Sequence, residues 1–280
     1  MVKFTVVSGN ASTDLAKRIA RKLKSPYIKT EKKVFPDGES KITINQIPKK
    51  SIVVVVQSTY PPVDSNLLEL LSIVSKVQKF SSKVYAVIPY MGYARQDREF
   101  LGGEIVTIGV VGKLLKAAGV KKVLTVDIHS KIVSAMDVLV KHFKKLKMKE
   151  PLVVSPDMGG QERAKKFANL LKTDFIALKK HRDRKTGKVN ILSDRVNVKN
   201  RDLVLVDDMI STGGSIVKAT QFLKKQKCRR VFVACTHALL VNDAAKKIKK
   251  AGVSQIVSTN TLPGESAKVD VSRVIADALK

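Results

Sequence analysis

The residues best suited to chemistry lie between positions 203 and 216. The apolar run 203–206 ends in two adjacent carboxylates, Asp207 and Asp208, and a loop of small hydroxyl residues and two glycines follows. This pattern predicts a buried parallel strand, a tight loop and the start of a helix. The loop amides and the positive end of the helix dipole can bind a phosphate group there, because adjacent glycines let the backbone approach it closely. The two carboxylates suit ribose hydroxyls or the water shell of Mg²⁺ beside that phosphate.

Five further segments place charged or metal-ligating side chains at predicted strand ends or in loops, where open α/β sheets bind ligands. They are Phe35 to Glu39, Pro89 to Arg98, Thr125 to Ser130, Val153 to Gly160 and Leu178 to Lys188. Two arginines of the second segment, Arg95 and Arg98, suit bidentate phosphate contacts and stacking on adenine. His129 could be a metal ligand or a satisfied polar residue. Lys180 and Arg182 alternate, so in an extended strand both side chains would point to one face.

Strand-like apolar runs alternate with amphipathic helices along the chain, and these elements must position the residues above. Such alternation is the pattern of a parallel sheet covered on both faces. The pattern also repeats, because similar strand-loop-helix units begin at Val6 and at Val153. The repeat indicates an α/β protein of two duplicated domains, each a mostly parallel sheet flanked by helices. We expect an N-terminal domain over 1–145, joined by a C-terminal helix at 271–280, and a C-terminal domain over 146–270. The first half's counterpart of the acidic loop, 57–62, has neither the carboxylate pair nor the glycines.

Composition narrows the class of protein. The chain has 280 residues, enough for two ordinary domains. The apolar run 52–56 is far below the length that crosses a bilayer, and residues 1–8 lack the apolar core of a signal peptide. Cys228 and Cys235 do not have the spacing of a metal-ligand pair and suit two reduced thiols in a cytoplasmic protein. We therefore expect a cytoplasmic protein with no membrane segment.

The charge balance is strongly basic. Lysine and arginine number 53 against 24 acidic residues, a formal net charge of +29. Such a field attracts polyanions in general, whether nucleotides, sugar phosphates or nucleic acid. No Gly-x-x-x-x-Gly-Lys-Ser/Thr loop and no Gly-x-Gly-x-x-Gly turn occurs, so a nucleotide would have to be bound by other means.

Taken in order, these motifs span nearly the full chain: Phe35 to Glu39, Tyr93 to Asp97, Val126 to His129, Ser155 to Asp157, Lys180 to Arg182 and Val206 to Ser215. The ordered set closely resembles the ribose-phosphate diphosphokinases (phosphoribosyl-diphosphate synthetases), particularly their shorter archaeal type. The acidic loop alone is shared with the phosphoribosyltransferases. The resemblance implies two phosphoribosyltransferase-like domains, with ATP and ribose 5-phosphate converted to AMP and phosphoribosyl diphosphate in the presence of Mg²⁺.

The resemblance also implies roles for individual residues. It makes Lys180 and Arg182 catalytic and His129 and Asp157 ligands of Mg²⁺. The ATP-binding residues it implies are Phe35, Asp37, Gly38 and Glu39, near a subunit interface of a homo-oligomer, and Arg95, Gln96 and Asp97. The ribose 5-phosphate-binding residues it implies are Arg182, Asp207, Asp208, Ser211, Thr212, Gly213, Gly214, Ser215 and Ile216. Non-specific binding of polyanions is a further expectation from the charge.

Two departures from the bacterial pattern stand out. Ser211 and Ser215 replace Asp and Thr of many bacterial relatives, and both keep a hydrogen-bonding group. The segment 99–104 is less basic than its bacterial counterpart, which puts regulation by ADP and phosphate in doubt.

Two rival functions remain open. A phosphoribosyltransferase would consume the diphosphate and would need neither the duplicated half nor the Lys180 and Arg182 pair. A non-enzymatic regulator that binds nucleic acid or a partner enzyme would account for the charge. Such a protein is expected to have lost Lys180, Arg182 or His129, and this chain retains all three.

Overall fold

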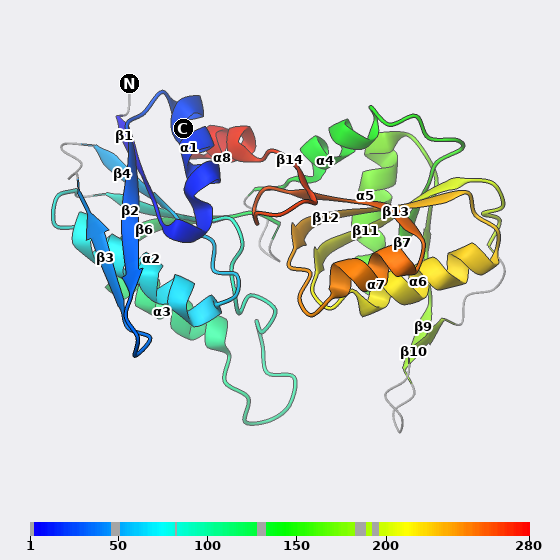
Figure 1. The fold of residues 1–280 in the computed structure, drawn as a ribbon, viewed down its shortest axis with the longest axis horizontal. Coiled ribbons are helices and arrows are strands. Elements are labelled where there is room, and N and C mark those ends of the chain that lie inside the picture. The colour runs from blue at the N-terminus through cyan, green and yellow to red at the C-terminus, as the bar shows by residue number, and fades with distance from the viewer. Residues whose placement is uncertain (1–2, 46–50, 82, 128–132, 183–188, 192–195) are drawn as a thin grey trace. The chain divides into compact units, whose positions relative to one another are not determined.

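The computed structural model describes residues 3–45, 51–81, 83–127, 133–182, 189–191 and 196–280. Its contacts divide the chain into two compact units. The first unit contains residues 1–134, 261–263 and 271–280, and the second contains 135–260 and 264–270. Each unit is a sheet with helices packed on it (Figure 1).

The first unit is built on a six-stranded sheet in the order β3-β2-β1-β4-β5-β6. All neighbouring strands are parallel except β3, which pairs antiparallel with β2. Its central strands are short, valine-rich and mostly buried on both faces, as expected of a parallel sheet. The strands are β1 (Phe4–Ser8), β2 (Tyr27–Val34), β3 (Ser40–Ile44), β4 (Ile52–Val56), β5 (Val84–Ile88) and β6 (Val120–Thr125).

Four helices cover this sheet, with α1 and α8 on one face and α2 and α3 on the other (Figure 1). The α2–α3 side buries Leu70, Ile73 and Leu115 in one cluster with Val53 and Val55 of the sheet. The C-terminal helix packs beside α1, far away in sequence. The helices are α1 (Thr13–Leu23), α2 (Val63–Val77), α3 (Thr107–Ala117) and α8 (Ser272–Leu279), and a 3₁₀ turn, Asn10–Ser12, precedes α1.

The second unit has a parallel six-stranded sheet in the order β14-β13-β12-β11-β7-β8. A separate antiparallel pair, β9 and β10, follows β8 along the chain. The strands are β7 (Leu152–Ser155), β8 (Phe175–Ala177), β9 (Lys180–Arg182), β10 (Val189–Ile191), β11 (Asp202–Ile210), β12 (Arg230–Ala238), β13 (Val253–Thr259) and β14 (Ala267–Val269).

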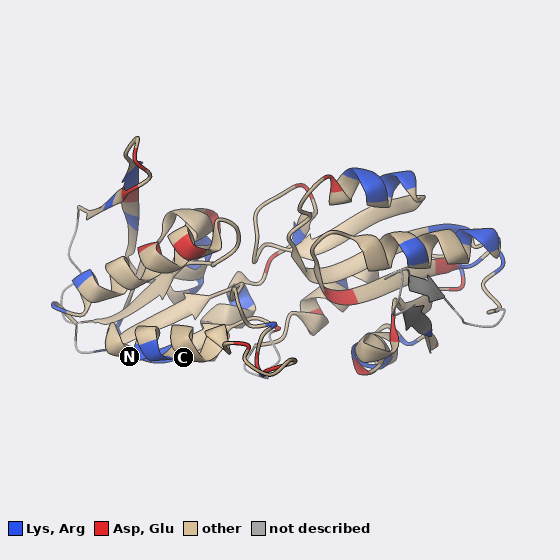
Figure 2. Cartoon of the chain, turned by 90° about the horizontal axis from the view of Figure 1, so that it is seen from below, with Lys and Arg blue, Asp and Glu red and all other residues tan. Residues whose placement is uncertain are grey.

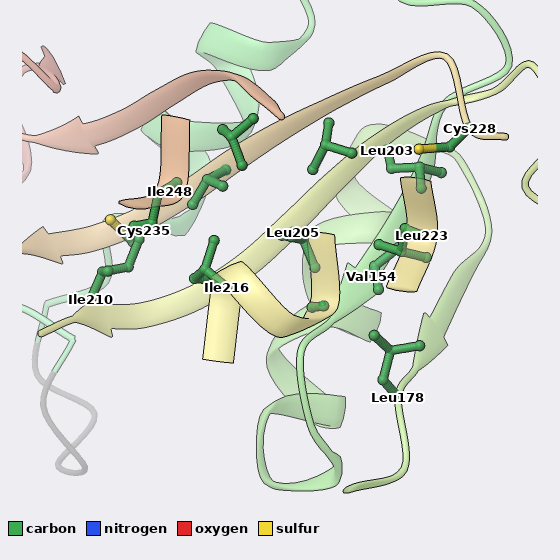
Figure 3. Packing of buried hydrophobic residues seen from close by; sticks show 14 of the residues in the cluster. Val154, Leu178, Leu203, Leu205, Ile210, Ile216, Leu223, Cys228, Cys235 and Ile248 are labelled. Atoms are coloured by element: carbon green, nitrogen blue, oxygen red, sulfur yellow. The ribbon is translucent and has the colours of Figure 1, made fainter. Parts of the chain in front are cut away.

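Helices also cover both faces of the second sheet. On one face, Ile216 and Leu223 of α6 and Ile248 of α7 share one buried cluster with Leu205 of β11 (Figure 3). On the other, α4 and α5 meet through an edge-to-face contact of Phe143 with Phe167, whose ring centroids are 5.7 Å apart. The helices are α4 (Met136–Phe143), α5 (Gln161–Leu171), α6 (Gly214–Lys225) and α7 (Ala244–Lys250), and a 3₁₀ turn, Met158–Gly160, precedes α5.

The two units share one topology. The order β2-β1-β4-β5-β6 in the first corresponds to β8-β7-β11-β12-β13 in the second. The predicted fold class, two duplicated domains with mostly parallel sheets, is confirmed. The predicted boundary at 145/146 falls after α4, whereas the contacts divide the chain before α4, which packs on α5 and β12.

Within the described residues, no helix combines the length and the apolar character that a membrane span requires. Cys228 and Cys235 are both free and buried.

Candidate active site

The predicted acidic pair lies at the carboxyl end of β11. The last β11 residue that pairs with β7 is Leu205, and beyond it β11 continues against β12 as far as Ile210. Asp207 and Asp208 belong to this extension, and their side chains keep 22% and 25% of their surface exposed. Two carboxylates that remain reachable at a strand end can accept hydrogen bonds from the hydroxyls of a ligand.

Arg163, which the sequence analysis did not single out, contacts this pair. It lies in the first turn of α5, and its Nη2 donates to Asp208 Oδ2 at 3.1 Å. Its Nη1 lies 3.9 Å from Asp207 Oδ1. The sequence signal was weak, because an arginine in a helix that also carries Lys165 and Lys166 reads as part of a solvated face.

The two aspartates differ in their ionisation. Desolvation, followed by the charge of Asp208, raises the pKa of Asp207 to about 7. Desolvation acts in the same direction on Asp208, but the charge of Arg163 and hydrogen bonds from its neighbours lower the pKa of Asp208 below its ordinary value. The pair therefore carries at least one negative charge near neutral pH.

The loop after the acidic pair has the geometry of a phosphate-binding turn. Gly213 is buried with φ at +74°, and a Cβ there would lie 2.8 Å from Ile248 Cδ1. Gly214 is exposed, and a Cβ there would meet nothing within 4 Å. The N-cap residue of α6 is Gly213, which has no side chain to cap the helix. The first amides of α6 can therefore bind an anion.

Asp157 lies just beyond the end of β7, the strand beside β11. Its Oδ1 accepts a hydrogen bond from Gly160 N at 3.2 Å at the start of the 3₁₀ turn. Since β7 and β11 are neighbours, Asp157 and the acidic pair lie at the same edge of the second sheet. The oxygen donors at this edge suit Mg²⁺, which takes one or two carboxylates and completes its shell with water and substrate phosphates. His129 lies outside the described residues. No cluster of three or more potential metal ligands occurs in the part of the chain that is described.

Lys180 and Arg182 are placed only by their backbone. Both belong to β9, where Lys180 is opposite Ile191 and Arg182 is opposite Val189 in β10. Their side chains lie outside what the structure describes, so their catalytic roles stay predictions.

The first predicted ATP segment forms the tip of the β2–β3 hairpin. Phe35 N donates to Glu39 O at 2.8 Å, and Glu39 N donates to Asp37 Oδ1 at 3.0 Å. Asp37, Gly38 and Glu39 are exposed, and Gly38 has φ at +91°. The hairpin thus presents its two carboxylates to solvent.

The second predicted ATP segment follows β5. Gln96 N donates to Tyr93 O at 3.0 Å, and Thr107 Oγ1 donates to Gln96 Oε1 at 3.3 Å. Arg95 and Asp97 are exposed. Strands β1 and β4 separate β5 from the β2–β3 hairpin, so the two segments come from different parts of the first sheet.

Comparisons with known proteins cover nearly the whole chain. The model of the N-terminal domain of ribose phosphate pyrophosphokinase matches residues 4–119, and the phosphoribosyl transferase domain model matches residues 125–270. A ribose-phosphate pyrophosphokinase of Sulfurisphaera tokodaii is 36% identical over 97% of this chain and 98% of its own length. That of Pasteurella multocida is 38% identical over 94% of this chain and 88% of its own.

A solved structure extends the match to the fold. The phosphoribosylpyrophosphate synthetase of Mycobacterium smegmatis aligns with a TM-score of 0.85 and 26% identity, covering 99% of this chain and 97% of that one. Fold and site thus define an enzyme class that joins two phosphoribosyltransferase-like domains. The chain belongs to the ribose-phosphate pyrophosphokinase family, and the predicted resemblance is confirmed.

Proposed function

We propose that the protein transfers the β,γ-diphosphoryl group of ATP to O1 of ribose 5-phosphate, giving 5-phosphoribosyl 1-diphosphate and AMP. The observation that carries this proposal is a family match over nearly the whole chain in which the acidic loop is complete and partly exposed. A phosphoribosyltransferase would account for the second unit but not for the first.

Ribose 5-phosphate binds at the end of β11 in this proposal. The amides of residues 211–216 and the start of α6 hold the 5-phosphate, and Asp207 and Asp208 accept hydrogen bonds from the ribose hydroxyls. The support is the start of α6, which has no side-chain cap, beside two partly exposed carboxylates.

ATP binds through the exposed hairpin tip 35–39 and the segment 95–97. Asp37 and Glu39 already lie at the end of a projecting hairpin, which suits a contact made with the active site of a neighbouring subunit (Figure 1). We therefore propose a homo-oligomer with the ATP site near a subunit interface, acting in the cytoplasm.

Transfer requires the anomeric hydroxyl to attack the β-phosphorus while the bond from that phosphorus to the α-phosphate oxygen breaks. Negative charge builds up on the transferred group and on the departing AMP, so fixed positive charge and positioning supply most of the catalysis. Lys180 and Arg182 provide that charge. Mg²⁺, held by Asp157 and His129, would add positive charge and orient the phosphate oxygens.

The basic surface gives the protein a second, non-specific affinity. Figure 2 shows lysines and arginines gathered on helices of the second unit. An open groove of about 530 Å³ beside α6 is lined by Gln221, Lys224, Lys225 and Ala251. We propose that polyanions bind such surfaces through charge alone, and this binding should weaken steeply as salt is added.

One assay tests the main proposal. The protein is incubated with ATP, Mg²⁺ and ribose 5-phosphate, and AMP is measured with and without the sugar. Sugar-dependent AMP release, in the absence of any nucleobase, is the expected result. AMP formation that does not depend on ribose 5-phosphate, or none at all, would refute the assignment.

A further inference from the structure

Arg163 connects the two loops of the second unit that carry the site. It follows the Asp157 turn by only a few residues, and α5, which holds it, packs against β7, β8 and β11. From this fixed helix it reaches the carboxylates at the end of β11. Its position is therefore set by packing within the second unit.

The geometry around Asp208 explains what such a cation does. Met209 N donates to Asp208 Oδ1 at 2.8 Å, while Arg163 Nη2 donates to Asp208 Oδ2 at 3.1 Å. Both oxygens are thus oriented by a donor. Asp208 N also donates to Asp207 Oδ1 at 2.9 Å, which fixes the Asp207 carboxylate to the backbone of its neighbour.

The pair needs this cation because two adjacent carboxylates, each about three-quarters covered, repel one another and lose solvation. With no cation beside them, Asp208 would also be protonated more readily or the two carboxylates would turn apart, and acceptor oxygens would be lost to a ligand. Arginine suits the task because its planar fork can reach two carboxylates at once and stays charged.

We infer that Arg163 is a positioning residue, which keeps Asp208 ionised and orients both carboxylates to accept the hydroxyls of ribose 5-phosphate. This inference rests on the proposed function of the acidic loop. Arg163 acts through the carboxylates and does not itself take part in the transfer.

The test compares Arg163→Met with Lys166→Met. Both remove one positive charge from α5, but Lys166 is exposed. Arg163→Met should raise the KM for ribose 5-phosphate on the order of 10- to 100-fold, because charge-assisted hydrogen bonds to the sugar are lost. The KM for ATP should change far less, and Lys166→Met should behave like the wild type. Arg163→Lys should recover part of the loss, since the charge returns without the fork.

A double-mutant cycle separates positioning from a general structural role. Because Arg163 acts through Asp208, the effects of Arg163→Met and Asp208→Asn should be strongly non-additive. Additive effects, or an unchanged KM for ribose 5-phosphate in Arg163→Met, would overturn the inference. If Arg163→Met fails to fold, Arg163→Lys replaces it in the cycle. A wild-type protein that uses no ribose 5-phosphate would instead refute the proposed function, so the two failures are distinguishable.

Discussion

The loops that follow β4 and β11 occupy equivalent places in two sheets of the same strand order, yet only one has the features of a ligand site. After β4 the chain reads Gln57, Ser58 and Thr59, and all three are buried. Beyond the part of β11 that pairs with β7 it reads Asp207 and Asp208, which are partly exposed.

The first-unit loop is filled by its own side chains. Gln57 Oε1 accepts from Ala11 N at 3.0 Å, and a Cβ on Gly9 would come within 2.2 Å of that oxygen. Ser58 N donates to Ser12 Oγ at 2.8 Å. Amides of the loops after β1 and β4 thus have partners within the first unit, whereas the helix that follows β11, α6, begins at a glycine with no side chain to cap it.

The difference shows that two sheets of one strand order can carry very different loops at the same place. In the first unit, neutral side chains bond to loop amides. The second unit has carboxylates, a cation and glycines there. Five predictions test this contrast.

The largest effect is expected in the second unit at Lys180. Lys180→Ala should lower turnover on the order of 10²–10³-fold, because one preorganised cation at the transferred group is lost. The matched change in the first unit, Lys17→Ala on the exposed side of α1, should leave turnover unchanged. Steady-state AMP release measures both. Near-normal AMP formation by Lys180→Ala would contradict the assignment.

Gln57→Ala tests the closed loop. The change leaves Ala11 N without its acceptor and opens a buried space, so the free energy of unfolding should fall by about 2 kcal/mol. The KM for ribose 5-phosphate should stay within about twofold of the wild-type value, because Gln57 lies in the first unit and contributes no group to the proposed ribose 5-phosphate site. Denaturant unfolding and steady-state kinetics measure the two quantities. A large rise in this KM with unaltered stability would show that the first loop also binds the sugar phosphate.

A pair of glycine variants tests the open loop. Gly213→Ala should destabilise the protein by about 1–2 kcal/mol, because alanine is strained at positive φ and its Cβ meets Ile248. It should also raise the KM for ribose 5-phosphate by displacing the loop amides. Gly214→Ala should change stability by less than about 0.5 kcal/mol, since its Cβ meets nothing. Equal destabilisation by the two variants would argue against the described loop geometry.

The smallest effect concerns pH. The pKa of Asp207 is raised from an ordinary value of 3.8 to about 7, so between these values the folded protein holds a proton that the unfolded chain has lost. Its contribution to stability is therefore present at low pH and is lost as pH rises through 7. Asp207→Asn should remove a slope on the order of 1 kcal/mol per pH unit across this window, measured by denaturant unfolding at several pH values. A profile identical to the wild type would show that Asp207 titrates normally.

The sequence was most informative about the acidic loop, whose structure follows from residues that are neighbours in the chain. Branched apolar residues followed by Asp207, Asp208 and two glycines predict a strand, a loop and a helix start, because backbone preference and burial decide each step locally. The contact between Arg163 and Asp208 joins residues 45 positions apart, and only the packing of α5 on β11 brings them together. The filling of the first loop by Gln57 was likewise hidden, since a glutamine after a strand does not reveal where its amide points.

The central claim is that one loop of the two binds ribose 5-phosphate. Calorimetric titration of ribose 5-phosphate into the wild type and into the Asp208→Asn variant tests this claim directly. We predict one site per chain in the wild type and a loss of affinity on the order of 10²-fold in Asp208→Asn, because charge-assisted hydrogen bonds to the sugar disappear. Two sites per chain, or undiminished binding by Asp208→Asn, would contradict the account.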